Sequence, residues 1–118
     1  MEMSQRLTNS RFPYLPIRLH VRQQASEMEA LIDTGFDGGM AVPPDVFAGQ
    51  PPDWYQRWAL ADGSQVLAPA YLGTVQVGDF DPVQTLIIAL GDEPLVGLDM
   101  VTRFSVILDH GQRVIVEP

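Results

Sequence analysis

The sequence contains no cysteine, and histidine is rare. The absence of cysteine excludes disulfide bonds, thiol nucleophiles, zinc knuckles and iron–sulfur clusters. The two histidines, His20 and His110, stand far apart, and the acidic residues do not cluster at the spacing that metal ligands require. We therefore expect no metal ion and no other cofactor.

Basic residues are also scarce. Seven arginines are scattered along the chain against 15 acidic residues, and the formal net charge is −8. Such a chain has no basic stripe and repels a nucleic-acid backbone or an anionic membrane surface. No window approaches the roughly 20 apolar residues of a membrane-spanning helix, and residues 1–10 lack the apolar stretch of a signal peptide. We expect a soluble, cytoplasmic protein that binds neither nucleic acid nor membranes.

Short apolar runs alternate with glycine and proline throughout the chain. Of its 118 residues 46% are hydrophobic, so one domain with a substantial core is expected. Ten glycines and ten prolines separate the apolar runs, a pattern typical of all-β proteins. We predict an all-β domain with one short helix over residues 13–118. Residues 1–12 are expected to form an N-terminal segment that is either disordered or part of a dimer interface.

The positions of the apolar runs predict the individual elements. Residues 17–22 alternate strictly between apolar and polar side chains, which indicates a strand with one buried face. Asp62 and Gly63 form a dipeptide well suited to a tight β-turn, so residues 54–77 are expected to form a long hairpin. The remaining expected elements are a turn at 23–26, strands at 27–32, 40–42, 85–90, 105–109 and 114–117, a helical turn at 44–47, and a helix at 100–104 capped by Asp99.

One segment, Asp33-Thr34-Gly35, follows directly on the apolar pair Leu31 and Ile32. A carboxylate that is buried without a partner costs several kcal/mol, so it takes up a proton or finds hydrogen-bond donors. Thr34 places a hydroxyl beside the acid, and Gly35 permits a tight turn and the close approach of another backbone. The pattern predicts a carboxylate held rigidly where a strand passes into a loop. The same three residues are also an ordinary turn signature, in which Asp33 merely caps a turn.

The order of the motifs along the chain resembles that of the retropepsin-like aspartic proteases, in particular the small bacterial and archaeal members with an Asp-Thr-Gly-Phe motif. The resemblance covers about residues 15–117. Residues 30–36 look like the catalytic loop, 61–64 like the tip of the flap, 95–100 like the second family motif with its helix, and 107–115 like the closing strands. The resemblance implies a closed, barrel-like acid protease fold, an aspartic endopeptidase activity and an obligate homodimer.

The resemblance assigns the catalytic role to Asp33, Thr34 and Gly35. Peptide hydrolysis without a nucleophile or a metal ion needs two carboxylates around one water, and this chain has one such motif, so a second copy must supply the other. Two carboxylates about 3 Å apart repel each other by roughly 5 kcal/mol at an effective dielectric constant near 20. The pair then keeps one shared proton at mildly acidic pH.

The resemblance implies substrate contacts for Phe36 and Asp37 and for the flap tip Asp62, Gly63 and Ser64. Small residues at the tip suit a lid that bends over an extended peptide and offers backbone hydrogen bonds to it. Two plainer interpretations stay open at this point. The hairpin is then an ordinary surface hairpin, and the residues after Phe36 form a solvated turn.

Three features depart from the viral members of the family. Phe36 replaces a small residue, so its ring either narrows the cleft or fills a neighbouring pocket. The residue after the glycine of the second motif is Leu98 rather than arginine, so Asp37 needs another partner, for which Arg103 is the candidate. The flap tip also lacks the multiple glycines of the viral sequences.

The alternatives to a peptidase follow from these departures. One is a non-catalytic, dimeric β-barrel that keeps the fold as a peptide-binding or interaction module, and another is a monomeric β-domain. The aromatic residues Trp54, Tyr55 and Trp58 either pack under the hairpin, which is the expectation, or form an exposed binding surface.

Overall fold

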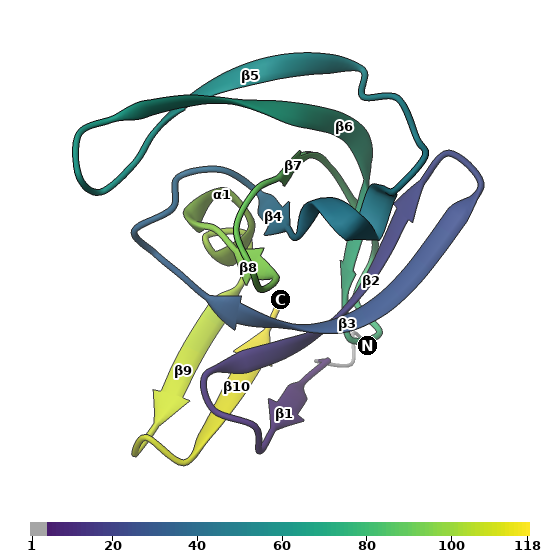
Figure 1. The fold of residues 1–118 in the computed structure, drawn as a ribbon. Helices are drawn as coiled ribbons and strands as arrows, with labels where there is room; N and C mark the ends of the chain where they lie inside the picture. Colours follow the sequence, from purple (N-terminus) through teal and green to yellow (C-terminus); the bar gives the residue numbers. More distant parts are fainter. Residues whose placement is uncertain (1–4) are drawn as a thin grey trace.

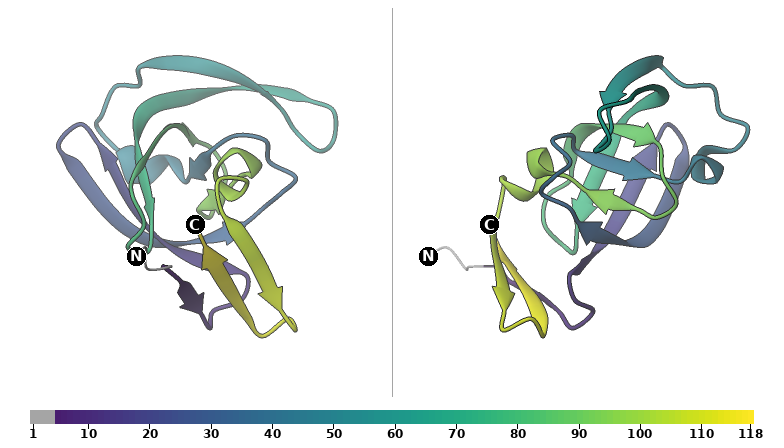
Figure 2. Two further views of the ribbon diagram at one scale, coloured as in Figure 1. Left: turned by 180° about the vertical axis from the view of Figure 1, so that it is seen from behind. Right: turned by 60° about the vertical axis from the view of Figure 1, so that its left-hand side comes forward.

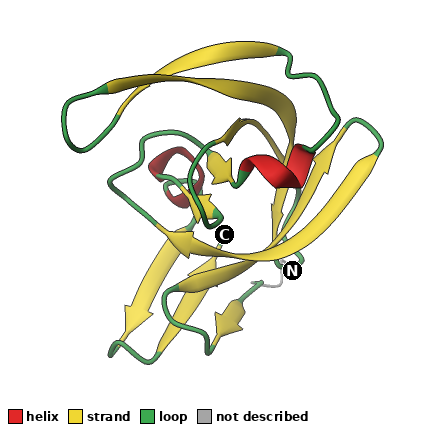
Figure 3. Cartoon of the chain, viewed as in Figure 1, coloured by secondary structure: helices red, strands yellow, loops and turns green. Residues whose placement is uncertain are grey.

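The computed structural model describes residues 5–118, which form two β-sheets and two very short helices (Figures 1 and 3). No helix within this range is long and apolar enough to cross a membrane. The elements in chain order are β1 (Leu7–Asn9), β2 (Tyr14–Val21), β3 (Gln24–Ile32), β4 (Met40–Val42), the 3-10 helix η1 (Pro44–Phe47), β5 (Trp54–Ala59), β6 (Gln65–Val77), β7 (Val83–Ala89), β8 (Leu95–Val96), α1 (Leu98–Val101), β9 (Ser105–Asp109) and β10 (Arg113–Glu117).

The larger sheet closes on itself. Its strand order is β2-β3-β8-β4-β7-β6-β5, and β2 also pairs with β6, so six strands form a closed barrel. Strand β5 lies outside this ring and pairs with β6. The closed, all-β barrel expected from the sequence is therefore confirmed.

Strand β2 shows why the sequence folds in this way. Its side chains Leu15, Ile17, Leu19 and Val21 are all at most 3% exposed and point into the barrel, while the residues between them are partly or fully exposed. An alternating strand can bury only one face, so this pattern fixes the register of β2 in the sheet. The turn that follows is shorter than expected, because β3 already begins at Gln24 rather than after residue 26.

The central strand β7 is buried where the sequence is most apolar. It pairs in parallel with β4 and antiparallel with β6, and both Ile87 and Ile88 are at most 1% exposed. Consecutive buried residues mean that both faces of the strand are covered, as expected for a strand in the middle of a sheet.

The hairpin of β5 and β6 extends along one side of the molecule (Figures 1 and 2). The expected turn is present between residues 60 and 64, with Gly63 at a φ of 87°. At the base of the hairpin, the Asp53 carboxylate accepts hydrogen bonds from the Leu72 amide at 2.8 Å and from the Arg22 guanidinium at 3.2 Å. The base is therefore tied to the barrel, and the turn is its free end.

The smaller sheet joins the two ends of the described chain. Its order is β1-β10-β9, with Val114 and Val116 fully buried beneath it. Residues 7–9 thus form a strand within the predicted N-terminal segment, while residues 1–4 lie outside the described part. The division at residue 12 remains a prediction. Strand β9 is an edge strand, and its side chains Ile107 and Leu108 are 44% and 53% exposed.

The helix predicted at residues 100–104 lies two to three residues earlier, as α1. Its N-cap is Gly97 rather than Asp99, and no side chain caps it. The physical reason is that backbone carbonyls of another segment accept the hydrogen bonds of its first amides, so a capping side chain is not required.

Candidate active site

Asp33 lies at the point where strand β3 ends. Strands β3 and β8 run parallel, and the Asp33 amide continues their ladder by donating to the Val96 carbonyl at 3.0 Å. The chain then turns, and the Gly35 amide donates to Asp33 Oδ1 at 2.9 Å. Asp33 is half-buried, whereas Thr34 and Gly35 are exposed. The carboxylate is thus held at a strand-to-loop transition with a backbone donor, which is the local geometry that the motif suggests.

A second segment, residues 97–99, is hydrogen-bonded across the loop that follows Asp33. Three successive amides of this segment donate to the loop: Gly97 to the Gly39 carbonyl at 2.9 Å, Leu98 to the Phe36 carbonyl at 2.7 Å, and Asp99 to the Gly38 carbonyl at 3.2 Å. These three hydrogen bonds join the two backbones and hold the loop that follows Asp33 in place.

Gly97 makes this close approach possible. A Cβ atom at this position would lie 2.6 Å from Phe36 Cδ2, 2.7 Å from the Phe36 carbonyl oxygen and still closer to the Gly38 carbonyl oxygen. No side chain fits there without moving the backbone of the loop that follows Asp33. Sequence reasoning treated Gly97 only as part of a motif, although the pairing of two glycine-bearing loops is the signal that could have identified it.

The Phe36 ring fills a pocket rather than leaving the loop open. Its centroid lies 5.2 Å from that of Trp58 on β5, and both rings belong to a small apolar cluster that includes Ala68, Ala70 and Ile88. The Phe36 ring therefore packs on Trp58, in the space between the hairpin and the loop of Asp33. Sequence reasoning did not connect Trp58 with Phe36.

Of the three aromatic residues expected under the hairpin, only Trp58 packs there. Trp54 and Tyr55 are 41% and 57% exposed, so the expectation was wrong for these two. Both lie at the start of β5, which is the edge strand of the larger sheet, and their side chains point to opposite faces of it.

The hairpin tip is held by contacts among its own residues. Asp62 Oδ1 accepts hydrogen bonds from the Ser64 hydroxyl at 2.6 Å and from the Ser64 amide at 2.8 Å. These bonds, above all that from the hydroxyl, hold the pKa of the Asp62 carboxyl below its usual value. Among residues 5–118, no hydrogen bond joins Asp62, Gly63 or Ser64 to the loop of Asp33. The structure therefore brings the hairpin to the loop through Trp58 and not through its tip.

Asp37 is exposed and does not pair with Arg103, the candidate partner. The Arg103 guanidinium lies 3.8 Å from the Asp99 carboxylate, one helical turn away, and also donates to the Asp99 carbonyl. Arg103 lies in the turn that follows α1, four positions after Asp99, and its guanidinium is therefore engaged by Asp99 rather than by Asp37.

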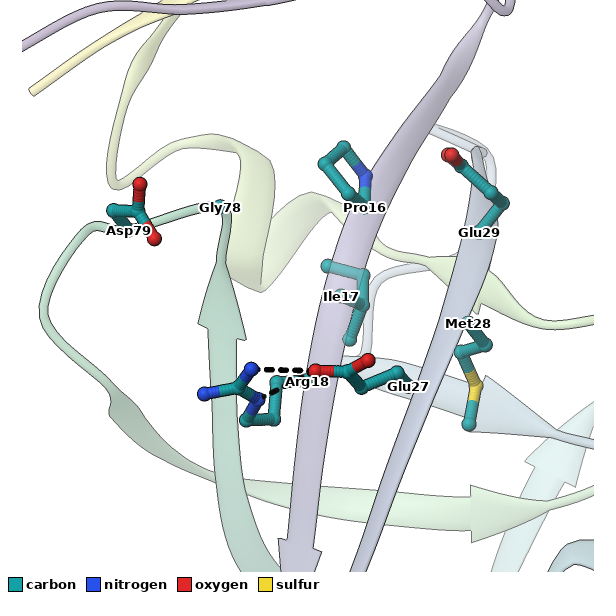
Figure 4. Close-up of a pocket in the computed structure, with 8 residues that line it drawn as sticks. All are labelled: Pro16, Ile17, Arg18, Glu27, Met28, Glu29, Gly78 and Asp79. Atoms are coloured by element: carbon teal, nitrogen blue, oxygen red, sulfur yellow. Dashed lines mark hydrogen bonds and ion pairs between the residues drawn. The ribbon is translucent and has the colours of Figure 1, made fainter.

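Four cavities formed by residues of the described part of the chain lie away from Asp33. One of them, of about 440 Å³, lies between β2, β3 and the turn at Gly78 and Asp79. Figure 4 shows its lining residues, among which Arg18 pairs with Glu27. Three further cavities of about 280 to 510 Å³ also lack Asp33 in their linings. The residues that the structure describes contain no group of three or more acidic or histidine side chains that could hold a metal ion.

Comparison with known proteins bears on the fold. No protein-family model matches the sequence, and no curated protein matches it. Among solved structures, the crystal structure of a retropepsin-like aspartic protease from Rickettsia conorii is similar, with a TM-score of 0.67. The two chains are 18% identical, and the alignment covers 99% of this chain and 96% of the other. The fold is therefore the retropepsin-like fold.

Proposed function

We propose that the protein is a homodimeric aspartic endopeptidase in which Asp33 of each subunit forms one half of the catalytic centre. The observation that carries the proposal is the position of Asp33 at the end of β3, with its carboxylate accepting from the Gly35 amide, in a chain of retropepsin-like fold. The proposal keeps the cytoplasmic location and the Asp-Thr-Gly-Phe subgroup expected from the sequence.

In this mechanism one water molecule lies between the two Asp33 carboxyl groups, which share one proton. The ionised carboxylate takes a proton from the water as its oxygen attacks the scissile carbonyl carbon, and the protonated carboxyl polarises the carbonyl oxygen. The C–N bond then breaks, and the leaving amine takes up the proton that the first carboxylate accepted from the water. Thr34 and Gly35 hold the two loops, while Phe36, Asp37 and the tip residues 62–64 contact the peptide.

Exposed apolar side chains beside the loop and on the edge strand β9 support a twofold partner. Leu98, whose amide donates to the Phe36 carbonyl, is 40% exposed, and the exposed side chains Ile107 and Leu108 follow on the edge strand β9. An edge strand with large apolar side chains offers unpaired backbone groups to another strand. A second copy of the chain can supply that strand because an antiparallel pair has a twofold axis.

The sequence of β9 is self-complementary in one register. When two copies pair antiparallel about Ile107, this residue faces its own copy, Leu108 faces Val106, and the Asp109 carboxylate faces the hydroxyl of Ser105. No acid then lies opposite an acid, and the apolar residues face one another, as cross-strand stability requires. A shift of the register by one residue would place Asp109 against Phe104 or Val106.

One observation favours the alternative of a non-catalytic, dimeric peptide-binding or interaction module. The rings of Phe36 and Trp58 occupy the space between the hairpin and the loop of Asp33, so less room is left for a bound peptide. A module of this kind would dimerise through the same surface but would not hydrolyse peptides.

The decisive experiment measures cleavage of a peptide library between pH 4 and 7 by the wild-type protein and by Asp33→Asn. Loss of the general base is expected to lower the rate by about 10²–10⁴-fold. Asp81→Asn is the matched control, because it removes one exposed carboxylate from a turn outside the site. If the wild-type protein cleaves nothing, or Asp33→Asn cleaves equally well, the proposed peptidase function is refuted. The alternative of a non-catalytic interaction module is then retained.

The dimer is tested separately by sedimentation. Ile107→Lys places a charge at the centre of the proposed contact and is expected to give a folded monomer with little activity. Thr8→Lys, which adds the same charge to β1 at the other edge of the same sheet, is expected to remain dimeric. A wild-type protein that is monomeric at micromolar concentration would favour the monomeric β-domain instead.

A further inference from the structure

Phe36 and Trp58 belong to a small apolar cluster in which Gly38, Ala68 and Ala70 leave room for the two rings. A Cβ atom on Gly38 would lie 2.6 Å from the end of the Phe36 ring and 2.8 Å from the Trp58 ring. Across the cluster, Ala68 and Ala70 on β6 are at most 2% exposed beneath the two aromatic residues. Small residues thus face the rings at Gly38, Ala68 and Ala70, while Ile88 completes the buried part of the cluster. The two rings set how much room remains between the hairpin and the loop.

The indole N–H of Trp58 is buried and finds no acceptor among residues 5–118. Most buried donors in proteins are paired, because an unpaired donor lowers stability. A ring that served stability alone would be expected to have its N–H satisfied. The unpaired donor instead fits a side chain that changes its position when a ligand binds beneath the hairpin. It also fits an indole N–H that donates to a carbonyl of a bound peptide.

We propose that Trp58 is a specificity-determining residue, and that its ring, packed on Phe36, limits the size of the side chain that a bound peptide can place against this pair. Glycine, alanine or serine fits at that position with Trp58 in its seat. A larger side chain overpacks the cluster unless the ring is displaced, and overpacking lowers affinity. The inference rests on the proposed peptidase function, since it assumes an extended peptide between the hairpin and the loop of Asp33.

The first experiment compares cleavage of octapeptide pools that carry either alanine or leucine at one position at a time. For the wild-type protein, one position is expected to favour alanine. Trp58→Ala is expected to shift the leucine-to-alanine ratio of kcat/KM at that position by about 10-fold or more toward leucine. Trp54→Ala is the matched control, because it removes the same ring from the same face of β5 at an exposed position.

A second variant covers the case in which Trp58→Ala does not fold, as judged by circular dichroism. Phe36→Ala opens the same space from the side of the loop and is expected to shift the same position in the same direction. The inference is overturned if neither variant, when folded, changes the preference at any position. It is also overturned if Trp54→Ala changes it as much as Trp58→Ala.

A binding measurement separates failure of this inference from failure of the proposed function. The chain has two tryptophans, so Trp54→Phe leaves Trp58 as the sole indole fluorophore. In the Asp33→Asn background, the alanine pool is expected to change the Trp58 emission at a concentration at least about 10-fold lower than the leucine pool. Size-dependent binding without cleavage by the wild-type protein would refute the proposed peptidase function but support the size selection by Trp58. Absence of both cleavage and size-dependent binding would overturn the inference that Trp58 selects side chains by size.

Discussion

Gly97→Ala is expected to be among the most damaging single substitutions in this chain, although it adds one methyl group. The φ of Gly97 is −90°, a conformation that alanine adopts freely, so backbone strain at residue 97 is not the cause. The cause is space, because the added Cβ would lie within 2.7 Å of the Phe36 carbonyl oxygen and even closer to that of Gly38. Both obstacles are backbone atoms that accept hydrogen bonds from residues 98 and 99.

The magnitude follows from what must move. Overpacking a core costs about 1–3 kcal/mol, and the upper end applies here because the obstacle is backbone and not the end of a side chain. A loss of about 3 kcal/mol lowers the melting temperature of a domain of this size by about 10 °C. Gly38→Ala meets only ring atoms of Phe36 and Trp58, so about 1–2 kcal/mol is expected there.

Urea denaturation of the two variants, alone and combined with Phe36→Ala, tests this reasoning. Removing the Phe36 ring takes away the nearest obstacle to a methyl group at Gly38. The double variant of Gly38→Ala and Phe36→Ala is therefore expected to lose less unfolding free energy than the sum of the two single variants. The same ring removal leaves the Gly38 carbonyl in place and is not expected to rescue Gly97→Ala. A Gly97→Ala protein as stable as the wild type, or one rescued by Phe36→Ala, would refute the reasoning.

Three other substitutions probe the tip, the base and the core. Because the Ser64 hydroxyl lowers the pKa of Asp62, this carboxylate supports the turn at any pH above its ordinary value, and the support is lost as the pH falls through the lowered pKa. Ser64→Ala is expected to raise that pKa, as NMR titration would show. Asp53→Asn weakens the acceptor of the Leu72 amide. We therefore expect a loss of about 1–2 kcal/mol in the free energy of unfolding and faster hydrogen exchange of this amide. Met100→Ala, at a fully buried position, is expected to cost about 2–5 kcal/mol in thermal unfolding.

Local patterns predicted those parts of the fold that a few neighbouring residues determine. The alternation from Ile17 to Val21 identified a strand and its buried face, because side chains on a strand point alternately to its two sides. Asp62 and Gly63 located the turn of the long hairpin, since the turn needs a residue that accepts a positive φ. The local surroundings of Asp33 were likewise readable, because they depend on Gly35 two positions away.

What remained hidden depends on partners that are distant in the sequence. Asp99 was a reasonable N-cap by residue type, yet the carbonyls of Phe36 and Gly38 accept the amides that a cap would have satisfied. The contact between Phe36 and Trp58 arises only when the hairpin folds over the loop, and no periodicity along the chain encodes it. Strand β1 is three residues long, too short to be identified without knowing that β10 pairs with it.

The pairing of β1 with β10 has a consequence for how the protein is made. Arg6 and Glu117, which form an ion pair at the end of this pairing, are 111 positions apart in the chain. Contacts this distant close slowly, because a large loss of chain entropy precedes them. Before residues 113–117 have been added, the smaller sheet lacks β10, and Leu7 has no strand to pair with. Until translation passes this point, the growing chain exposes apolar edges that other nascent chains or chaperones can bind.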